Sequence, residues 1–227
     1  MAFNIRAEKS LTAIKICGIT KVSQAKAIAS LGANAIGVIG VEKSPRFVSE
    51  DQRRKLFDVL KSHSPNLNRV WVIANKSDSE ITQALRGQGI PSTVQLHGDE
   101  SPKRCIDLRR KYPNIQWWKA LQVRNSLDIS KAHNYEKAAD ALLLDAWSPS
   151  ELGGTGHRIP LDWIKQENFH IPWWLAGGID AEWIPEIFNQ IRPFGIDASS
   201  RLEKSPGIKD LKLVSALITA IKSIKND

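Results

Sequence analysis

Short apolar runs alternate with longer, more polar stretches along the chain. Eight of these runs have the character of buried strands and begin near the following positions: Ile14, Ile36, Arg69, Thr93, Gln116, Ala141, Pro172 and Phe194. Their starts are separated by 22, 33, 24, 23, 25, 31 and 22 residues. Each interval accommodates one strand and one helix, so the pattern predicts a repeating strand–helix unit.

Helix-start signals lie between the apolar runs. Thr20 is placed to cap a helix that ends near Leu31. The other signals are two capping boxes and a first-turn proline: Ser49 with Gln52, Ser77 with Glu80, and Ser101 followed by Pro102. Near the end of the chain, one helical face collects these apolar residues: Leu211, Val214, Leu217, Ile218, Ile221 and Ile224. We therefore expect eight repeats of a strand followed by a helix.

This regular alternation predicts the α/β class with a parallel sheet. Eight units in 227 residues fit a single closed (βα)8 barrel, the TIM barrel, better than an open doubly wound sheet, which usually has fewer strands. No composition shift marks a linker or a second domain. We expect one domain over residues 1–227, with residues 1–12 as a short solvated lead-in.

The composition is that of an ordinary soluble protein, with 42% hydrophobic and 25% charged residues. The apolar runs are far shorter than the stretch of about 18 residues that spans a bilayer, so no membrane helix is expected. Arg6, Glu8 and Lys9 interrupt the segment where a secretion signal would have its apolar centre. Cys17 and Cys105 lack CxxC spacing, as a reducing compartment permits, and we expect a cytoplasmic protein.

The net charge of +8 raises the question of nucleic-acid binding. Apart from Arg109, Arg110 and Lys111, the basic residues are spread singly among acidic ones, with no basic arm. This distribution argues against nucleic acid as a partner. A generally positive field instead favours the approach of a small anionic metabolite.

In a (βα)8 barrel, chemistry takes place on the loops that follow the strands. Strand alternation predicts that Lys15 and Cys17 point the same way, into the barrel mouth. A nearby ammonium group would lower the pKa of the thiol and make it a base or nucleophile. Gly18 allows a tight turn beside a ligand. The competing interpretation is that Cys17 is only a small buried hydrophobe.

Further candidates follow other strands. Arg46 presents a planar fork that suits a carboxylate, although a solvated surface arginine is the alternative. His97 is assigned to the pocket wall. Asp145 ends an apolar strand beside Trp147, where partial desolvation would raise its pKa and suit acid catalysis; a turn cap is the competing role. The glycine-rich residues 153–156 are expected to form a mobile loop over a substrate.

The loops after the seventh and eighth strands predict phosphate binding. Gly177 and Gly178 permit close backbone approach, while Ser199 and Ser200 offer hydroxyl donors and Arg201 adds charge. A plain turn is the alternative for the paired glycines. Five scattered histidines suggest no metal site.

Six blocks of the sequence, taken together and in order, resemble the phosphoribosylanthranilate isomerase family. They are KICGIT, GANAIGVIG followed by KSPRFV, VQLHGDE, LLLDAWSPSELGGTG, LAGGI, and DASS with EKSPGIKD. The resemblance runs from about Ile14 to Leu217. It implies a (βα)8 barrel of tryptophan biosynthesis that uses no cofactor. The implied reaction is an Amadori rearrangement of N-(5-phosphoribosyl)anthranilate to 1-(2-carboxyphenylamino)-1-deoxyribulose 5-phosphate.

The resemblance also implies site residues. Cys17 matches the family's general base, Asp145 its general acid, and Arg46 the arginine that holds the anthranilate carboxylate. Gly177, Gly178, Ser199 and Ser200 match its phosphate-binding loops. Lys15 and Arg201 are further substrate-binding candidates, chosen from their positions in this sequence and not from the family. The family usually has glycine at position 201. A left-handed backbone there would disfavour arginine, so either the loop differs slightly or the side chain joins phosphate binding. The expected partner is a small phosphorylated substrate, and the expected state is a monomer or homodimer.

Three alternatives remain. Another phosphate-binding barrel enzyme, such as indole-3-glycerol-phosphate synthase or a different sugar-phosphate isomerase, would share the last two loops without explaining Cys17 and Asp145. A non-catalytic barrel that binds phosphorylated metabolites or a protein would tolerate the loss of Cys17. A nucleic-acid-binding protein would show steeply salt-dependent affinity.

Overall fold

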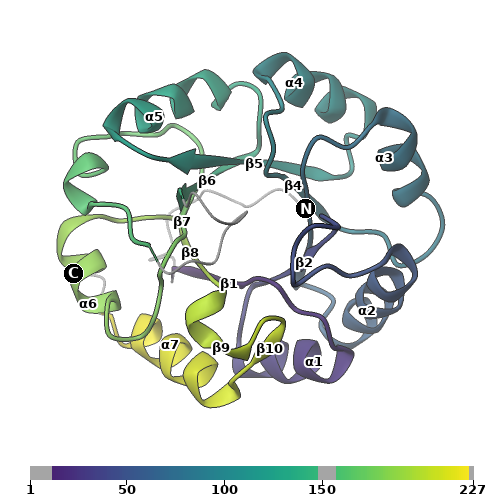
Figure 1. The fold of residues 1–227 in the computed structure, drawn as a ribbon, viewed down its shortest axis with the longest axis horizontal. Coiled ribbons are helices and arrows are strands. Elements are labelled where there is room, and N and C mark those ends of the chain that lie inside the picture. Colours follow the sequence, from purple (N-terminus) through teal and green to yellow (C-terminus); the bar gives the residue numbers. More distant parts are fainter. Residues whose placement is uncertain (1–11, 148–156, 225–227) are drawn as a thin grey trace.

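Eight parallel strands close into a barrel in the computed structural model, which describes residues 12–147 and 157–224 (Figure 1). The strands are β1 (Ala13–Ile16), β2 (Ala35–Ile39), β3 (Asn68–Ile73), β4 (Thr93–Leu96), β5 (Gln116–Val123), β6 (Ala141–Ala146), β7 (Trp173–Leu175) and β8 (Gly195–Ala198). Each pairs with its neighbours in sequence, and β1 pairs with β8 to close the ring. Every start lies within one residue of the position expected from the apolar runs. The predicted (βα)8 barrel is confirmed.

Helices form the outer ring (Figure 1). They are α1 (Val22–Leu31), α2 (Glu50–His63), α3 (Asp78–Ala84), α4 (Pro102–Lys111), α5 (Ser126–Ser130), α6 (Ile184–Gln190) and α7 (Leu211–Ser223). Three 3-10 turns accompany them: η1 (Lys131–Tyr135), η2 (Leu161–Trp163) and η3 (Ser200–Leu202). The strand–helix repeat differs from the prediction in the sixth unit, where the described part holds only η2. None of the described helices is long and apolar enough to span a membrane.

The helix caps explain where several helices begin. The side chain of Ser77 accepts a hydrogen bond from the backbone N–H of Glu80, whose carboxylate accepts from the Ser77 backbone, which completes the expected capping box. Ser49 and Ser101 also cap their helices. The expected Thr20 cap is wrong, because α1 begins at Val22 without a side-chain cap and the Thr20 hydroxyl donates to the carbonyl of Gly207 instead.

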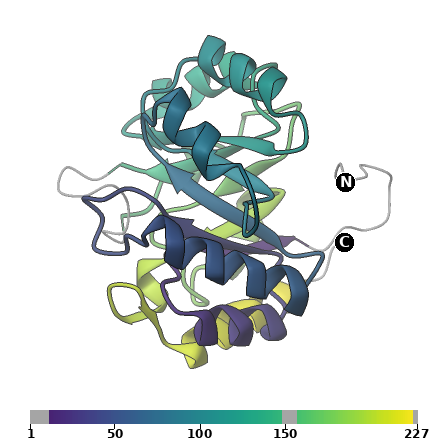
Figure 2. The ribbon, with the colours of Figure 1, turned by 90° about the vertical axis from the view of Figure 1, so that its right-hand side faces the viewer.

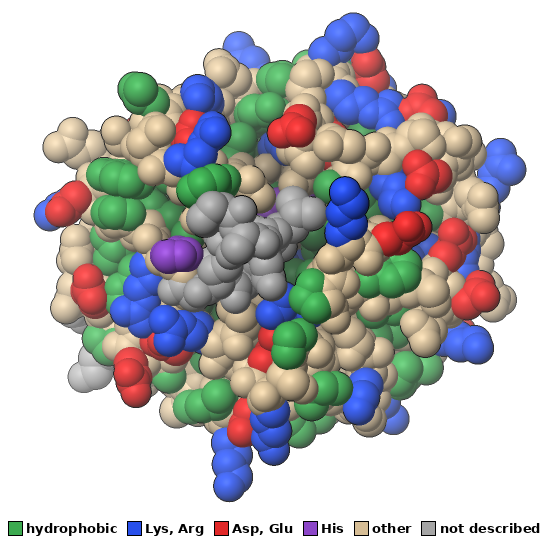
Figure 3. Space-filling view, viewed as in Figure 1, with side chains coloured by type: hydrophobic (Ala, Val, Ile, Leu, Met, Phe, Trp, Pro, Cys, Tyr) green, Lys and Arg blue, Asp and Glu red, His purple; other side chains and the backbone are tan. Residues whose placement is uncertain are grey.

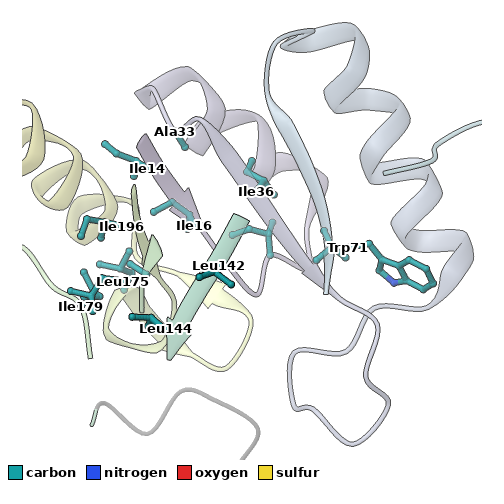
Figure 4. Packing of buried hydrophobic residues seen from close by; sticks show 14 of the residues in the cluster. Ile14, Ile16, Ala33, Ile36, Trp71, Leu142, Leu144, Leu175, Ile179 and Ile196 are labelled. Atoms are coloured by element: carbon teal, nitrogen blue, oxygen red, sulfur yellow. The ribbon is translucent and has the colours of Figure 1, made fainter. Parts of the chain in front are cut away.

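Two apolar layers follow from strand alternation. Outward-facing residues pack against the helices, as Figure 4 shows for Ile14, Ile36, Leu142, Leu175 and Ile196. Inward-facing residues form a second cluster: Ala13, Cys17, Ala35, Val70, Val72, Trp118, Ala120, Ala141, Leu143, Trp174 and Ala176. Both faces of the parallel sheet are therefore buried, as is usual for this class.

Aromatic rings fill the inside of the barrel. Trp118 and Trp174 stack with their ring centroids 4.8 Å apart, and Phe194 meets Trp174 edge-on. A Cβ at Gly195 would lie 2.3 Å from the Trp174 ring, so the strand needs glycine at this point. The interior is a packed core, and any cavity has to lie at the end where the strands give way to their loops.

A short antiparallel hairpin, β9 (Glu203–Ser205) and β10 (Ile208–Lys209), follows β8 and was not expected from the sequence. It lies beside α1, where Gln24 exchanges hydrogen bonds with the backbone of Lys209 in both directions (Figure 1). Figure 2 shows the hairpin at the same end of the barrel as the loop between β2 and α2. This hairpin brings two charged side chains to the barrel mouth.

Candidate active site

A cavity opens at the ends of the strands, with about 740 Å³ of space that includes part of the solvent at its mouth. Its wall contains eight of the nine site residues expected from the sequence: Cys17, Arg46, Asp145, Gly177, Gly178, Ser199, Ser200 and Arg201. Lys15 is the ninth, and it lies fully buried beneath this wall. Residues 153–156, the expected mobile loop, are outside the described residues. The loops after six strands thus converge on one hollow.

Cys17 follows β1 directly and is 7% exposed. The sulfur fits because β2 has glycine opposite it: a Cβ on Gly37 would lie 2.6 Å from Sγ. Burial raises the pKa of the Cys17 thiol, and the ammonium groups of Lys15 and Lys209 offset only part of this effect. The pKa lowering expected from a neighbouring ammonium group is therefore outweighed by desolvation.

Lys15 pairs with Asp197 across the seam that closes the barrel. Its Nζ lies 2.7 Å from Oδ2 of Asp197, and the two residues are in register on β1 and β8. Burial lowers the pKa of Lys15, but Asp197 and Cys17 raise it by more, so the ammonium stays charged. The Oδ1 atom of Asp197 has no hydrogen-bond partner among the described residues, and Asp197 lines the cavity. Sequence reasoning assigned no role to Asp197, although it is the first residue of the quoted DASS segment.

Asp145 is the penultimate residue of β6 and is 8% exposed. Its Oδ2 lies 3.4 Å from Nε2 of His97, which follows β4. The amide nitrogen of Gln95 lies 3.0 Å from the other ring nitrogen, Nδ1, and holds the imidazole in place. This contact leaves Nε2 facing Asp145. His97 lines the cavity, as expected, and also contacts the candidate acid.

The loops after β7 and β8 form one side of the cavity. Gly177 and Gly178 have φ values of +90° and +62°, a region that other residues rarely adopt. A Cβ on Gly177 would also lie 2.5 Å from the Cβ of Ala146. The Ser199 hydroxyl donates to the carbonyl of Cys17 over 3.2 Å, so this loop is tied to the turn that carries the thiol. Backbone geometry therefore favours glycine at both positions, and lack of space also requires it at Gly177.

Arg201 is exposed and lies in η3, beside Ser200. Among the described residues, Asn75 is the only non-glycine residue with a positive φ, so Arg201 does not adopt the left-handed backbone that would disfavour it. The loop accommodates arginine by forming a 3-10 turn, and Arg201 takes part in the cavity wall.

Arg46 is 5% exposed, so the surface-arginine interpretation is wrong. Its Nε and Nη2 atoms donate to both carboxylate oxygens of Glu203 over 2.9–3.1 Å. Glu203 also accepts from Nζ of Lys209 at 2.7 Å, and that ammonium donates to the carbonyl of Ser199. Sequence reasoning assigned no role to Glu203 or Lys209, although both lie in the EKSPGIKD segment. No group of three or more His, Cys, Asp or Glu in the described part of the chain could hold a metal ion.

Comparisons with known proteins agree with this geometry. The N-(5'phosphoribosyl)anthranilate (PRA) isomerase family profile matches residues 14–220. The chain is 45% identical over 212 residues to the N-(5'-phosphoribosyl)anthranilate isomerase of Nostoc punctiforme, covering 92% of this chain and 98% of the relative.

Comparison with solved structures also finds phosphoribosyl anthranilate isomerases. Phosphoribosyl anthranilate isomerase from Thermotoga maritima superposes with a TM-score of 0.82 at 29% identity, covering 94% of this chain and all of that one. A phosphoribosyl anthranilate isomerase in complex with reduced 1-(o-carboxyphenylamino)-1-deoxyribulose 5-phosphate superposes with a TM-score of 0.76, also at 29% identity and with the same coverage. By profile, sequence and structure, this chain belongs to the N-(5'-phosphoribosyl)anthranilate isomerase family.

Proposed function

We propose that this protein isomerises N-(5-phosphoribosyl)anthranilate to 1-(2-carboxyphenylamino)-1-deoxyribulose 5-phosphate, a step of tryptophan biosynthesis. The observation that carries the proposal is the cavity that holds Cys17, Asp145 and Arg46 together with the glycine and serine loops. A relative of known structure binds a reduced form of this product, and the whole of that relative superposes on 94% of this chain. The substrate has an anion at each end, which matches a cavity with two anion-binding regions.

The proposed reaction begins with ring opening. Asp145, as general acid, gives its proton to the ribose ring oxygen while the bond from that oxygen to C1 breaks. The nitrogen lone pair then forms a double bond to C1, which yields a protonated Schiff base. His97, 3.4 Å from the Asp145 carboxyl group, is placed to orient it toward the sugar. The charged carbon–nitrogen double bond makes the proton on C2 acidic.

Proton removal from C2 is assigned to Cys17. As a thiolate it takes the C2 proton, and the electrons of the C–H bond form a C1–C2 double bond while the nitrogen regains its lone pair. The resulting enolamine has a hydroxyl on C2. Loss of that hydroxyl proton and protonation of C1 give the ketone product. The nearby iminium cation favours the thiolate, and this counteracts the burial that raises the pKa of Cys17.

Binding the two ends of the substrate places the sugar between acid and base. We propose that backbone N–H groups near Gly177 and Gly178, with Ser199, Ser200 and Arg201, hold the phosphate, and that Arg46 holds the anthranilate carboxylate. Such orientation contributes as much to rate as the proton transfers do. Lys15 is reassigned from direct substrate contact to holding Asp197 and supplying positive charge beside Cys17.

The direct test is an activity assay with freshly generated phosphoribosylanthranilate, whose fluorescence disappears as it is converted. We expect the purified protein to accelerate the loss of fluorescence and the product to have the mass of its substrate. A flat trace would contradict the proposed function. Release of carbon dioxide from added 1-(2-carboxyphenylamino)-1-deoxyribulose 5-phosphate, with no loss of phosphoribosylanthranilate fluorescence, would favour a synthase of the indole-glycerol-phosphate type. Tight product binding without turnover would favour a non-catalytic barrel.

We also propose a cytoplasmic protein, monomeric or homodimeric, that binds a small phosphorylated molecule and no nucleic acid. Cys17 and Cys105 are both free and buried, as suits a reducing compartment. On the face shown in Figure 3, Lys and Arg side chains lie among Asp and Glu side chains around the rim. A filter-binding titration with DNA and RNA at low salt is expected to show no retention, and salt-dependent retention would contradict this proposal.

A further inference from the structure

The contact between Arg46 and Glu203 uses one defined edge of the guanidinium group. Nε donates to both carboxylate oxygens at 3.1 Å, and Nη2 donates to Oε2 at 2.9 Å. A guanidinium group is a planar fork with five N–H bonds, so a partner on the Nε–Nη2 edge fixes the direction of the Nη1 end. Arg46 lines the cavity, whereas Glu203 is not part of its described wall. Glu203 therefore holds Arg46 from behind.

Lys209 changes the net charge of the group formed by Arg46 and Glu203. A carboxylate bound to Arg46 alone would cancel its charge and weaken its attraction for a second carboxylate. Nζ of Lys209 lies 2.7 Å from Oε1 of Glu203, and the Lys209 side chain is fully buried. The three charged groups together keep one positive charge in excess. Arg46 is thus fixed in place without losing its attraction for an anion.

The turn after β1 completes the arrangement. A Cβ on Gly18 would lie 2.7 Å from Cδ of Arg46 and 3.2 Å from Oγ of Ser199. The stem of Arg46 therefore crosses the turn that carries Cys17. A shift of the guanidinium group would move the anthranilate end of the substrate relative to the thiol.

We propose that Glu203 is a positioning residue, which fixes the Arg46 guanidinium so that its Nη1 end receives the substrate carboxylate, with Lys209 as the balancing charge. This inference rests on the proposed function, in which Arg46 binds that carboxylate. It assigns the β9–β10 hairpin a role in substrate selection, because both Glu203 and Lys209 belong to it. Glu203 acts through Arg46 and touches no reacting atom.

The direction in which Glu203→Gln changes the affinity for anthranilate shows whether Glu203 positions Arg46 or competes with the substrate for it. If Glu203 merely competed for Arg46, Glu203→Gln would free the guanidinium, add positive charge and tighten the binding of a carboxylate. If Glu203 positions Arg46, the same change loosens it. We expect the inhibition constant of anthranilate and the KM of the substrate to rise about tenfold, with kcat changing less. The inhibition constant of inorganic phosphate, which probes the other end of the site, is expected to stay unchanged.

A second variant separates geometry from charge. Glu203→Asp keeps the negative charge but shortens the side chain by one methylene, so it cannot meet both Nε and Nη2 in the same way. We expect Glu203→Asp to weaken anthranilate binding as well. In an Arg46→Ala background, both changes at position 203 are expected to have little further effect, because their target is gone.

Asp128→Asn is the matched control. Asp128 also lies buried between two cations, at 2.9 Å from Arg124 and 2.7 Å from Lys131, in the α5 segment. We expect this change to lower the melting temperature while leaving the anthranilate inhibition constant unchanged. The proposal is overturned if Glu203→Gln leaves anthranilate binding unchanged or tightens it, weakens phosphate equally, or acts undiminished in the Arg46→Ala background. Absence of turnover by the unmodified protein would instead contradict the proposed function.

Discussion

The two residues proposed for proton transfer, Cys17 and Asp145, are each more than nine-tenths buried. Both stand at the end of an apolar strand, where the sheet ends and the loops begin. Burial removes competing water from a group that has to exchange a proton with the substrate. The same burial raises the pKa of Cys17, so its neighbours determine how much thiolate is available.

Replacing either group removes a proton-transfer partner. We expect Cys17→Ala and Asp145→Asn each to lower kcat by about 10²-fold or more, while the affinity for the product changes little. Steady-state kinetics and product titration measure the two effects separately. Near-normal kcat in either variant would remove that residue from its proposed role.

The pH dependence of the reaction follows from the raised pKa of Cys17. A base works only when deprotonated, so kcat/KM is expected to rise with pH until it passes the pKa of the thiol in the free enzyme. Once ring opening has formed the iminium cation in the bound complex, that cation lowers the pKa of the thiol, so the rise in kcat is expected at lower pH than the rise in kcat/KM. Profiles measured between neutral and alkaline pH test this order. Coincident profiles would contradict the proposed effect of the cation.

The sequence was sufficient to locate residues whose role depends on their own strand. Cys17, Asp145 and the paired glycines follow apolar runs directly, so alternation and strand ends pointed to the cavity. Glu203 and Asp197 act through partners 157 and 182 residues away in the chain. These pairs depend on barrel register and on an unexpected hairpin, neither of which a local pattern contains.

At the scale of elements, strand starts were predictable within one residue because buried parallel strands are continuous apolar runs. The start of helix α1 was less predictable. Thr20 is a residue type that often caps helices, but its hydroxyl donates to the carbonyl of Gly207 in the hairpin instead. The sixth unit departs from the repeat because η2 is its only described helical turn. Local sequence signals predict an element well unless a tertiary hydrogen bond uses the side chain on which the signal depends.

A histidine–glutamate network joins η1 to the segment before β7. His133 contacts Glu136 at 2.6 Å and Glu167 at 2.8 Å, and His170 contacts Glu136 at 3.0 Å. The Glu167 carboxylate, with Glu136, raises the pKa of His133 above its usual 6.5. Despite some burial, hydrogen bonds from His133 and His170 lower the pKa of Glu136 below its usual 4.5.

These pKa shifts predict where the network stabilises the fold. The His133 contribution is complete below about pH 6.5 and is lost as pH rises through its raised pKa. The Glu136 contribution is present above about pH 4.5 and is lost as pH falls through its lowered pKa. We expect His133→Gln to lower the melting temperature most between these two values and least at alkaline pH. An equal decrease at all pH values would show that the charge of His133 is irrelevant.

For the whole molecule, the net charge of +8 favours the approach of an anionic substrate. Salt screens this field, with a Debye length that shrinks from about 30 Å at 0.01 M to about 3 Å at 1 M. We expect kcat/KM to decrease as potassium chloride is raised, with kcat changing less. An uncharged osmolyte at matched viscosity is the control, and a salt-independent kcat/KM would limit electrostatic attraction to the cavity itself.

The seam between β1 and β8 has a consequence for biosynthesis of the protein. The thiol at position 17 is synthesised 182 residues before Ser199, which donates to the carbonyl of that same residue. Catalytic competence therefore arrives only after the segment that holds Ser199 has been made. A polypeptide that ends before β8 is expected to show no isomerase activity rather than partial activity.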